Sequence, residues 1–254
     1  MGARLGQHFL FDPSILGRIA DAAQLTPGDT VLEIGPGRGT LTRQLIDRAG
    51  RVIAIETDRR LAAALATLLH GRAEIVQGDA LKVAWPRADV VVGNIPYQIT
   101  SPLIERALQL PRPRRIVFLV QREVALRLAA EPGTKEYGAL SAGVQLVATV
   151  ERLFGVKAGA FRPPPRVESA VVRITPRERP LTNGPDEEAR VRALIQALFQ
   201  RRRQQLARSL REALSLEPAE STNALERLGV DPATRVERLA PEQLVALARL
   251  TQPA

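Results

Sequence analysis

The 254-residue chain contains no cysteine and only two histidines, His8 and His70. The lack of cysteine excludes disulfide bonds, thiol catalysis and zinc sites built on cysteine. Two imidazoles are too few for a typical histidine-based metal site, so we expect no bound metal. Aromatic residues make up only 4% of the chain, with one tryptophan and two tyrosines. A tyrosine in an otherwise polar stretch is therefore informative.

Long apolar runs are also missing. No run approaches the roughly 20 residues that a membrane-spanning helix needs. The first residues, "MGARLGQHFLFDP", lack the apolar core and small-residue cleavage site of a secretory signal. We therefore expect a soluble, cytoplasmic protein with no membrane partner. Hydrophobic residues make up 45% of the sequence, which at this length predicts one large domain, or one domain with a small appendage.

Basic residues exceed acidic ones and give a net charge of +9. Of the 36 basic residues 33 are arginine. A GC-rich genome would explain arginine in place of lysine, but not the surplus over acids. Such a surplus favours a polyanionic partner, of which nucleic acid is the commonest.

Strand-like and helix-like stretches alternate over residues 30–120, and a further helical stretch follows. The apolar, β-branched stretches are 30–35, 51–56, 73–79, 88–94 and 114–121, and the helical ones are 40–50, 58–71, 101–110 and 123–130. This alternation predicts a parallel sheet with helices on both faces. Ligands of such sheets bind at the carboxyl ends of the strands. Beyond a Pro-rich linker at 175–185, the chain is predicted to be helical over 186–252, with breaks at Pro218, 229–232 and Pro241.

The first three strand ends carry glycines and acids. "EIGPGRG" (33–39) suits dinucleotide binding, S-adenosylmethionine binding or a plain tight loop, and its G-x-G-x-G spacing argues against a nicotinamide cofactor. Glu56, at the second strand end, can accept both ribose hydroxyls of a nucleoside, or it is an ordinary charge at a helix start. Asp79, at the third, can accept from an adenine amine, or it is a turn residue. Together the three ends outline a site for a nucleoside.

The fourth strand end reads "GNIPYQIT" (93–100). The Asn94 side-chain oxygen and the Ile95 carbonyl can accept the two N–H bonds of an exocyclic base amine and hold its nitrogen pyramidal. Pro96 keeps that carbonyl fixed. Tyr97 offers a face on which a base can stack. The alternative is a turn with a half-buried tyrosine, but the neighbouring strand ends favour a site for a target base.

These motifs resemble those of one family. "GQHFL" (6–10), "EIGPGRGTLT" (33–42), "GDA" (78–80) and "NIPYQIT" (94–100) are similar to the ribosomal RNA adenine dimethyltransferases of the small subunit. The likeness continues through 118–128, 137–141, 161–174 and 199–210, and so covers nearly the whole chain.

The resemblance implies an α/β fold with two domains. A class I, Rossmann-like S-adenosylmethionine-dependent methyltransferase domain would span 1–178, and a small, all-helical RNA-binding domain would span 186–254. The cofactor would be S-adenosyl-L-methionine, converted to S-adenosyl-L-homocysteine. The substrate would be two adjacent adenines in the 3′-terminal hairpin loop of small-subunit (16S) rRNA, dimethylated at N6 on a pre-30S particle. The protein would act as a monomer.

The resemblance also implies roles for individual residues. The cofactor would contact His8, Leu10, Gly35, Gly37, Glu56, Asp79, Ala80 and Asn94, with Gly35 at its amino-acid end, Glu56 at its ribose and Asp79 at its adenine. Catalysis would use Asn94, Ile95 and Pro96, with Tyr97 and Phe161 sandwiching the flipped base.

A cluster of arginines in the helical tail is expected to grip RNA phosphates. On a continuous helix, i, i+7 and i+8 spacings bring several of its members to one side. The alternative is a solvated helix face. The cluster consists of Arg201, Arg202, Arg203, Arg208 and Arg211.

The implied reaction is an in-line displacement in which the amine nitrogen attacks the methyl carbon. The sulfonium is already a good leaving group, so no metal is required, and catalysis rests on positioning and on carbonyl dipoles. The alternatives are an Erm-type large-subunit rRNA methyltransferase, a DNA adenine methyltransferase and a ribosome-assembly factor that binds RNA without catalysis.

Overall fold

The computed structural model describes residues 8–251, which form two compact units. The sheet unit comprises the residues up to 125 together with 150–176, and the helical unit comprises 126–149 and the residues from 177 onward. Residues 126–149, which the sequence assigned to the first domain, thus pack with the C-terminal helices. The functional division into a catalytic and an RNA-binding domain stays a prediction.

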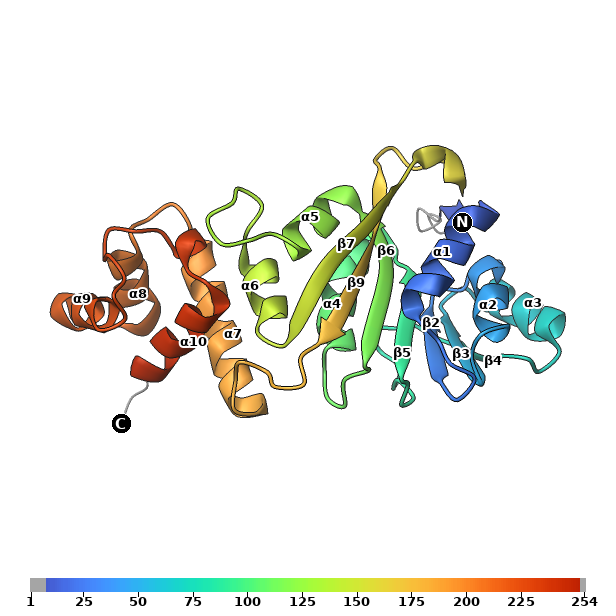
Figure 1. The fold of residues 1–254 in the computed structure, drawn as a ribbon, viewed down its shortest axis with the longest axis horizontal. Coiled ribbons are helices and arrows are strands. Elements are labelled where there is room, and N and C mark those ends of the chain that lie inside the picture. Colours follow the sequence, from blue (N-terminus) through green and yellow to red (C-terminus); the bar gives the residue numbers. More distant parts are fainter. Residues whose placement is uncertain (1–7, 252–254) are drawn as a thin grey trace. The chain divides into compact units, whose positions relative to one another are not determined.

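A seven-stranded mixed sheet forms the centre of the sheet unit (Figure 1). Its order is β4-β3-β2-β5-β6-β9-β7, and the five strands from β4 to β6 are parallel. β9 runs antiparallel to β6. The strands are β2 (Thr30–Ile34), β3 (Arg51–Glu56), β4 (Glu74–Gln77), β5 (Val90–Asn94), β6 (Arg115–Gln121), β7 (Ala148–Val156) and β9 (Ser169–Pro176). The sequence predicted the five parallel strands but not the mixed edge.

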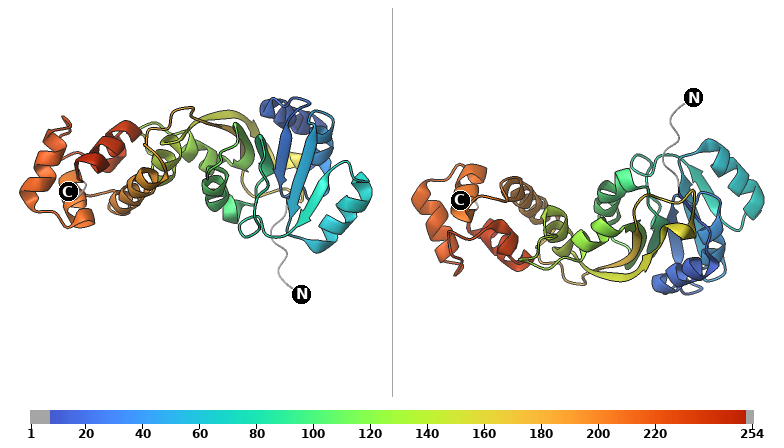
Figure 2. Two further views of the ribbon diagram at one scale, coloured as in Figure 1. Left: turned by 90° about the horizontal axis from the view of Figure 1, so that it is seen from below. Right: turned by 90° about the horizontal axis from the view of Figure 1, so that it is seen from above.

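The helices of this unit lie on both faces of the sheet (Figure 2). They are α1 (Pro13–Ala23), α2 (Thr40–Ile46), α3 (Arg59–Leu69) and α4 (Thr100–Ala107), with short helices η1 (Tyr97–Ile99) and η2 (Ala158–Ala160). Helix α5 (Arg122–Leu128) crosses the boundary between the two units at residue 125. The side chains of Asp12 and Asp58 cap α1 and α3 by accepting backbone N–H bonds in the first turn. Because helices cover both faces, β5 is apolar throughout Val90–Val92 and almost fully buried.

A short antiparallel ribbon lies apart from the main sheet. β1 (Phe9–Leu10) pairs with β8 (Phe161–Arg162), and Leu10 lies opposite Phe161. The backbone N–H of Phe11 extends this pairing with a 3.1 Å hydrogen bond to the Ala160 carbonyl. The ribbon therefore holds the start of the described chain beside residues 160–163.

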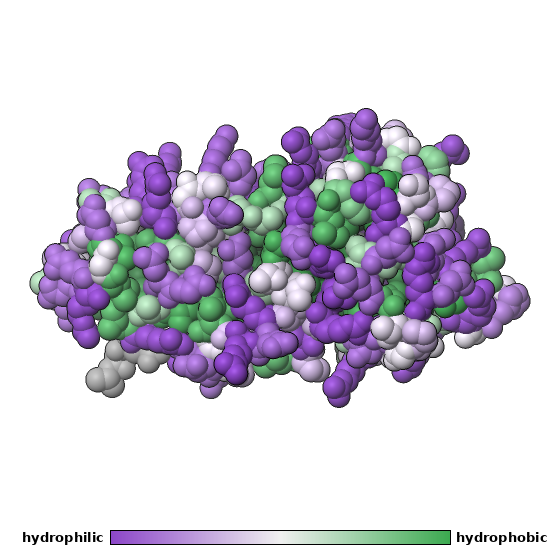
Figure 3. Space-filling model, in the orientation of Figure 1, coloured by the Kyte–Doolittle hydropathy of each residue, from purple (hydrophilic) through white to green (hydrophobic). Residues whose placement is uncertain are grey.

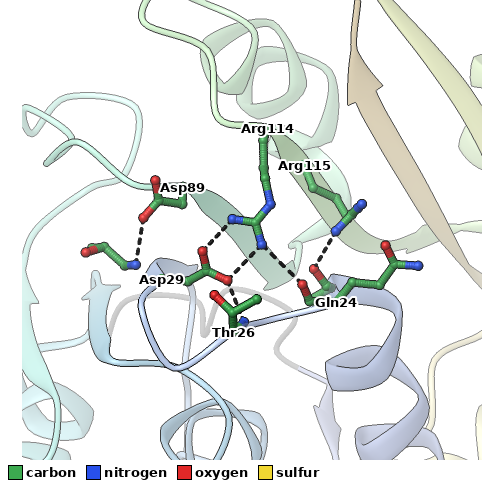
Figure 4. A network of polar contacts seen from close by, with 8 residues as sticks. Gln24, Thr26, Asp29, Asp89, Arg114 and Arg115 are labelled. Carbon is green, nitrogen blue, oxygen red and sulfur yellow. Dashed lines mark hydrogen bonds and ion pairs between the residues drawn. The ribbon is translucent and has the colours of Figure 1, made fainter.

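The amino ends of the parallel strands carry a network of polar contacts (Figure 4). Arg114, just before β6, forms a two-pronged ion pair with Asp29, just before β2, and also donates to the Gln24 carbonyl at 3.1 Å. Arg115 donates to the Ala23 carbonyl at 3.0 Å. Asp89 accepts from the Thr30 N–H at 2.8 Å. These contacts tie the starts of three strands to the end of α1.

The helical unit contains α6 (Ala139–Gln145), α7 (Pro185–Gln200), α8 (Leu206–Leu214), α9 (Pro218–Glu226), η3 (Val236–Arg238) and α10 (Pro241–Leu250). Proline opens α7, α9 and α10, a position at which its missing N–H costs nothing. The side chain of Tyr137 is fully buried, and its hydroxyl donates to the Leu239 carbonyl at 3.1 Å. Arg249 pairs with Glu187 and lowers the pKa of that carboxyl to about 2.

The prediction that 186–252 breaks only at Pro218, 229–232 and Pro241 is wrong at two points. The break after α9 extends from 227 to 240, with only the short helix η3 inside it. α7 ends at Gln200, and a turn occupies 201–205 before α8 begins at Leu206. Leu206 donates its N–H to the Thr234 carbonyl at 2.7 Å, so the start of α8 is held by residues from a later turn. The arginine cluster therefore does not lie on one continuous helix.

Within residues 8–251, no helix is both long and apolar enough to cross a membrane. Hydrophilic side chains dominate the face drawn in Figure 3, with small apolar areas between them.

Candidate active site

A cavity of about 410 Å³ opens at the carboxyl ends of the parallel strands, within the sheet unit. That size suits a small molecule. It lies where β2 separates β3 on one side from β5 on the other, which is the usual ligand position in such sheets. The predicted site residues that line it are His8, Leu10, Gly35, Gly37, Glu56, Asp79, Ala80, Asn94, Ile95, Pro96 and Tyr97.

The turn after β2 brings backbone close to the cavity. Gly35, Gly37 and Gly39 have φ angles of +71°, +57° and +75°, which favour glycine. A side chain at Gly37 would lie 3.0 Å from the ring of Phe9. The turn can therefore cradle a ligand with backbone groups, and substitution would close the space.

Glu56 joins the end of β3 to this turn. Its side chain is buried, one carboxylate oxygen accepts the Gly37 N–H at 3.0 Å, and the other accepts the Asp58 N–H at 2.9 Å. A carboxylate has about four lone-pair sites, so two remain available for hydroxyl donors in the cavity. The geometry fits the expected ribose contact.

The turn after β4 places Asp79 at the cavity. Its Oδ1 accepts the Leu81 N–H at 2.9 Å, and its Oδ2 lies 3.9 Å from Lys82 Nζ. Side-chain hydrogen bonds hold this turn in place. Trp85 donates to the Ala80 carbonyl at 2.8 Å, and Arg106 donates to the carbonyls of Leu81 and Val83. The sequence analysis did not predict these hydrogen bonds from Trp85 and Arg106. The lone tryptophan of the chain was the available signal.

The end of β5 presents Asn94 to the cavity in a fixed orientation. Its Nδ2 donates to the His8 carbonyl at 2.9 Å, which leaves the amide oxygen as its acceptor for a ligand. Ile95 is 1% exposed, and its N–H donates to the Leu119 carbonyl at 3.1 Å. The backbone that carries both predicted acceptors is therefore held by the sheet.

The side chain of Tyr97 is held by contacts of both its hydroxyl and its ring. Its hydroxyl forms a 2.8 Å hydrogen bond with the hydroxyl of Ser169, which is itself buried. Its ring stacks against the imidazole of His8, with the ring centres 6.0 Å apart and the planes inclined by 30°. His8 Nδ1 in turn lies 2.8 Å from the Pro163 carbonyl. The aromatic ring is thus held in place at the cavity.

Glu33 lines the same cavity and was not singled out from the sequence. It is 1% exposed, and its Oε2 makes no hydrogen bond. Burial raises the pKa of its carboxyl to about 7, opposed by the Thr42 hydroxyl and reinforced by the charge of Glu56. The sequence signal was an acid inside an apolar strand, two residues before Gly35.

Phe161 is not among the residues that line the cavity. Its side chain is 2% exposed and packs in the core with Leu10 and Val156. Sandwiching a base with Tyr97 would require the ring to leave that core, and this role stays a prediction.

The arginine cluster is largely paired with acids. Arg201 and Arg208 both bind Glu212, at 3.0 and 2.8 Å, and Arg202 binds Glu237. The Arg208 and Arg201 guanidiniums hold the pKa of Glu212 below its usual range. Arg203 and Arg211 form no ion pair within residues 8–251. The predicted grip on phosphates is untested, and only these two members offer an uncommitted charge.

The cavity residues fit S-adenosylmethionine. The orphaned oxygen of Glu33 suits a cationic ligand, Glu56 suits a diol, and Gly37 leaves room that a side chain would fill. Across the described residues, no cluster of three or more His, Cys, Asp or Glu side chains could hold a metal ion.

Comparisons with known proteins agree with this geometry. A family model described as "Ribosomal RNA adenine dimethylase" matches residues 2–252. The chain is 43% identical over 253 residues to a "Ribosomal RNA small subunit methyltransferase A" from Gloeobacter violaceus, covering 96% of this chain and 91% of the relative.

Two solved structures are similar over nearly the whole chain. A dimethyladenosine transferase from Plasmodium falciparum has a TM-score of 0.86 at 30% identity, covering 94% of this chain and 96% of the other. The 23S rRNA methyltransferase ErmE has a TM-score of 0.77 at 32% identity, covering 95% and 98%.

Proposed function

Because the chain belongs to the ribosomal RNA adenine dimethylase family, we propose that it dimethylates N6 of two adjacent adenines in the 3′-terminal hairpin loop of small-subunit rRNA, with S-adenosylmethionine as methyl donor. It is an rRNA adenine dimethyltransferase. The observation that carries the proposal is the convergence of four strand ends, from β2 to β5, on one cavity of small-molecule size.

S-adenosylmethionine supplies an electrophilic methyl group on a sulfonium. Glu56 and Asp79 bind its ribose and adenine, and the glycine turn accommodates its amino-acid end. The pKa of the buried Glu33 carboxyl is about 7, and a positive charge on the ligand beside it would favour its ionised form, so Glu33 can offer negative charge to this ligand. Because Glu33 is already desolvated when the ligand binds, that contact is strong in a low dielectric.

Asn94 and Ile95 act on the target amine. The Asn94 oxygen and the Ile95 carbonyl accept its two N–H bonds, so the nitrogen lone pair points out of the base plane. Both acceptors are preorganised, through the 2.9 Å contact to His8 and the 3.1 Å contact to Leu119. Their dipoles face the positive charge that develops on the nitrogen. Tyr97 supplies the stacking face for a base taken out of its helix.

The small-subunit assignment is favoured over the large-subunit alternative. The curated relatives at 41–43% identity over nearly the full length of the chain are named small-subunit methyltransferases. Among the solved structures, the dimethyladenosine transferase has a TM-score of 0.86 and the large-subunit enzyme ErmE one of 0.77, at similar identities of 30% and 32%. A non-catalytic assembly factor would not need Asn94 and Tyr97 held in place. Action on a pre-30S particle, in the cytoplasm and as a monomer, completes the proposal.

The deciding experiment uses a strain that lacks the protein. Mass spectrometry of its small-subunit rRNA, with and without complementation, should show two N6,N6-dimethyladenosines only when the intact protein is present. A matched complementation with Asn94→Ala should leave both adenines unmethylated. Dimethyladenosines that persist without the protein, or that appear in large-subunit rRNA instead, would refute the assignment.

A further inference from the structure

Arg38 is a charged residue of the cavity to which the motifs and the mechanism have assigned no role. It follows Gly37 in the turn after β2 and lines the cavity. Its guanidinium lies 4.9 Å from the centre of the Phe9 ring, and Phe9 lines the same cavity. The attraction between the cation and the aromatic ring favours side-chain conformations that keep the guanidinium near Phe9.

The charged residues that line the cavity differ in which groups of the ligand they can bind. The lining acids are Glu33, Glu56 and Asp79. Among the described residues of the lining, Arg38 is the only side chain that is always cationic. S-adenosylmethionine has one anionic group, its α-carboxylate, and an acid-rich cavity would repel that group unless a cation met it.

We propose that Arg38 binds the α-carboxylate of the methyl donor and makes the cavity selective for donors that carry this group. The inference rests on the proposed function, since it presumes that S-adenosylmethionine occupies the cavity. The guanidinium fork matches a carboxylate in a two-pronged geometry, which lysine does not reproduce. Arg38 lies beside the glycine turn, the part of the cavity already assigned to the amino-acid end of the donor. It is thus a specificity residue, distinct from the acceptors that act on the target base.

The test compares two ligands that differ only in the carboxylate. Isothermal titration calorimetry would measure the affinities of S-adenosylhomocysteine and of its decarboxylated analogue for the full chain. The wild-type protein should prefer the carboxylate-bearing ligand by about 10–100-fold, the range expected for hydrogen bonds between charged groups. Arg38→Gln should reduce the preference to about threefold or less while leaving the affinity for the decarboxylated ligand unchanged. Arg38→Lys should retain an intermediate preference.

Arg43 provides the matched control. It is an exposed arginine on α2 that does not line the cavity. Arg43→Gln removes the same charge from the adjoining helix and should leave the preference as in the wild type. Thermal melts of both variants check that the fold is intact.

The proposal would be overturned by a preference retained in Arg38→Gln, by an equal loss for both ligands, or by the same effect from Arg43→Gln. A wild-type protein that binds the carboxylate-bearing ligand without any preference would refute the role of Arg38 alone. A wild-type protein that binds neither ligand would refute the proposed donor, and this inference with it.

Discussion

Polar side chains are mostly paired with one another at the amino ends of the parallel strands, whereas some at the carboxyl ends have atoms without a partner among the described residues. At the amino ends, Arg114 and Asp29 satisfy each other, and the ion pair holds the pKa of Asp29 well below its usual range. At the carboxyl ends, Glu33 is buried without a partner for Oε2, and Asn94 keeps its amide oxygen for a ligand. Paired polar groups stabilise a fold, whereas unpaired ones cost stability and provide binding energy.

The division is not complete, because Nε of Arg115 at the amino ends is also buried without a hydrogen bond. Its other contact, to the Ala23 carbonyl, fixes the guanidinium in place. The comparison nevertheless predicts opposite outcomes for substitutions at the two ends. Loss of a paired group, such as Asp29 at the amino ends, should weaken folding, and loss of a group left free for a ligand, such as Asn94 at the carboxyl ends, should weaken function.

The largest effect is expected at Asn94. Asn94→Ala should slow methyl transfer by at least about 10²–10³-fold, the cost of losing one preorganised polar group at a reaction centre. The fold should remain intact, because only the 2.9 Å contact to the His8 carbonyl is lost. Single-turnover methylation of small subunits and thermal melts would measure the two quantities. Full activity, or a loss that simply follows unfolding, would contradict the assignment.

Glu33→Gln should stabilise the protein at high pH. The folded carboxyl has a pKa of about 7 against an ordinary value of 4.5, so folding becomes less favourable as the pH rises through this interval. The variant removes that penalty and should gain up to about 3 kcal/mol at pH 8 and little at pH 4.5. Urea unfolding at both pH values would measure the gain.

Glu56→Gln is the control for this prediction. Both of its carboxylate oxygens accept backbone N–H bonds, so the amide should destabilise the protein at neutral pH. If both variants shift stability in the same direction, the contrast between paired and unpaired acids fails.

Asp29→Asn should lower the free energy of unfolding by about 2 kcal/mol at pH 7, by weakening charge-assisted hydrogen bonds to Arg114. Because the folded pKa of Asp29 is depressed, its contribution is complete above the ordinary pKa near 4 and is lost as the pH falls further. The wild type and the variant should therefore converge in acid. Affinity for S-adenosylhomocysteine should not change, since Asp29 lies at the opposite end of the strands. A weakened affinity without a change in stability would contradict the view that polar groups at the amino ends serve the fold and not the binding of ligand.

Tyr97→Phe should weaken the binding free energy of the target base by about 1 kcal/mol, the typical contribution of a neutral hydrogen bond. The ring that is proposed to stack on the base is kept, but the 2.8 Å contact to Ser169 is lost. Tyr97→Ala should cost about 1–3 kcal/mol in capture of the base. Kinetic titration with small subunits would separate the two, and equal losses would show that the hydroxyl, not the ring, is what matters.

The smallest effect concerns the arginine cluster, where the same contrast applies. Replacement of Arg203 and Arg211 should reduce the slope of RNA affinity against salt concentration by about 2 log units, if each neutralises one phosphate. Replacement of Arg201 and Arg208 should reduce it less, because both are already paired with Glu212. Filter binding over a range of salt concentrations would compare the double variants. Equal reductions would show that Glu212 releases its arginines to RNA.

Local patterns in the sequence determined most of the fold and most of the cavity lining. Five parallel strands follow from apolar runs bounded by turn residues, and their carboxyl ends must meet at one edge of the sheet. The order of strands and turns along the chain is therefore enough to bring Glu56, Asp79, Asn94 and Tyr97 together, and all four line the cavity. Their convergence does not depend on which side chains pair with which.

Only the tertiary structure decided which polar and aromatic groups are committed to partners. Phe161 lies in the core because β8 pairs with a strand formed near residue 10, far away in the sequence. Arg201 and Arg202 meet acids 11 and 35 residues away, and the helix expected through them ends at Gln200. Glu33 and Arg38 line the same cavity, where one has a carboxylate oxygen without a hydrogen bond and the other has its cation over the Phe9 ring. Such pairings depend on long-range packing and burial, which a one-dimensional pattern does not contain.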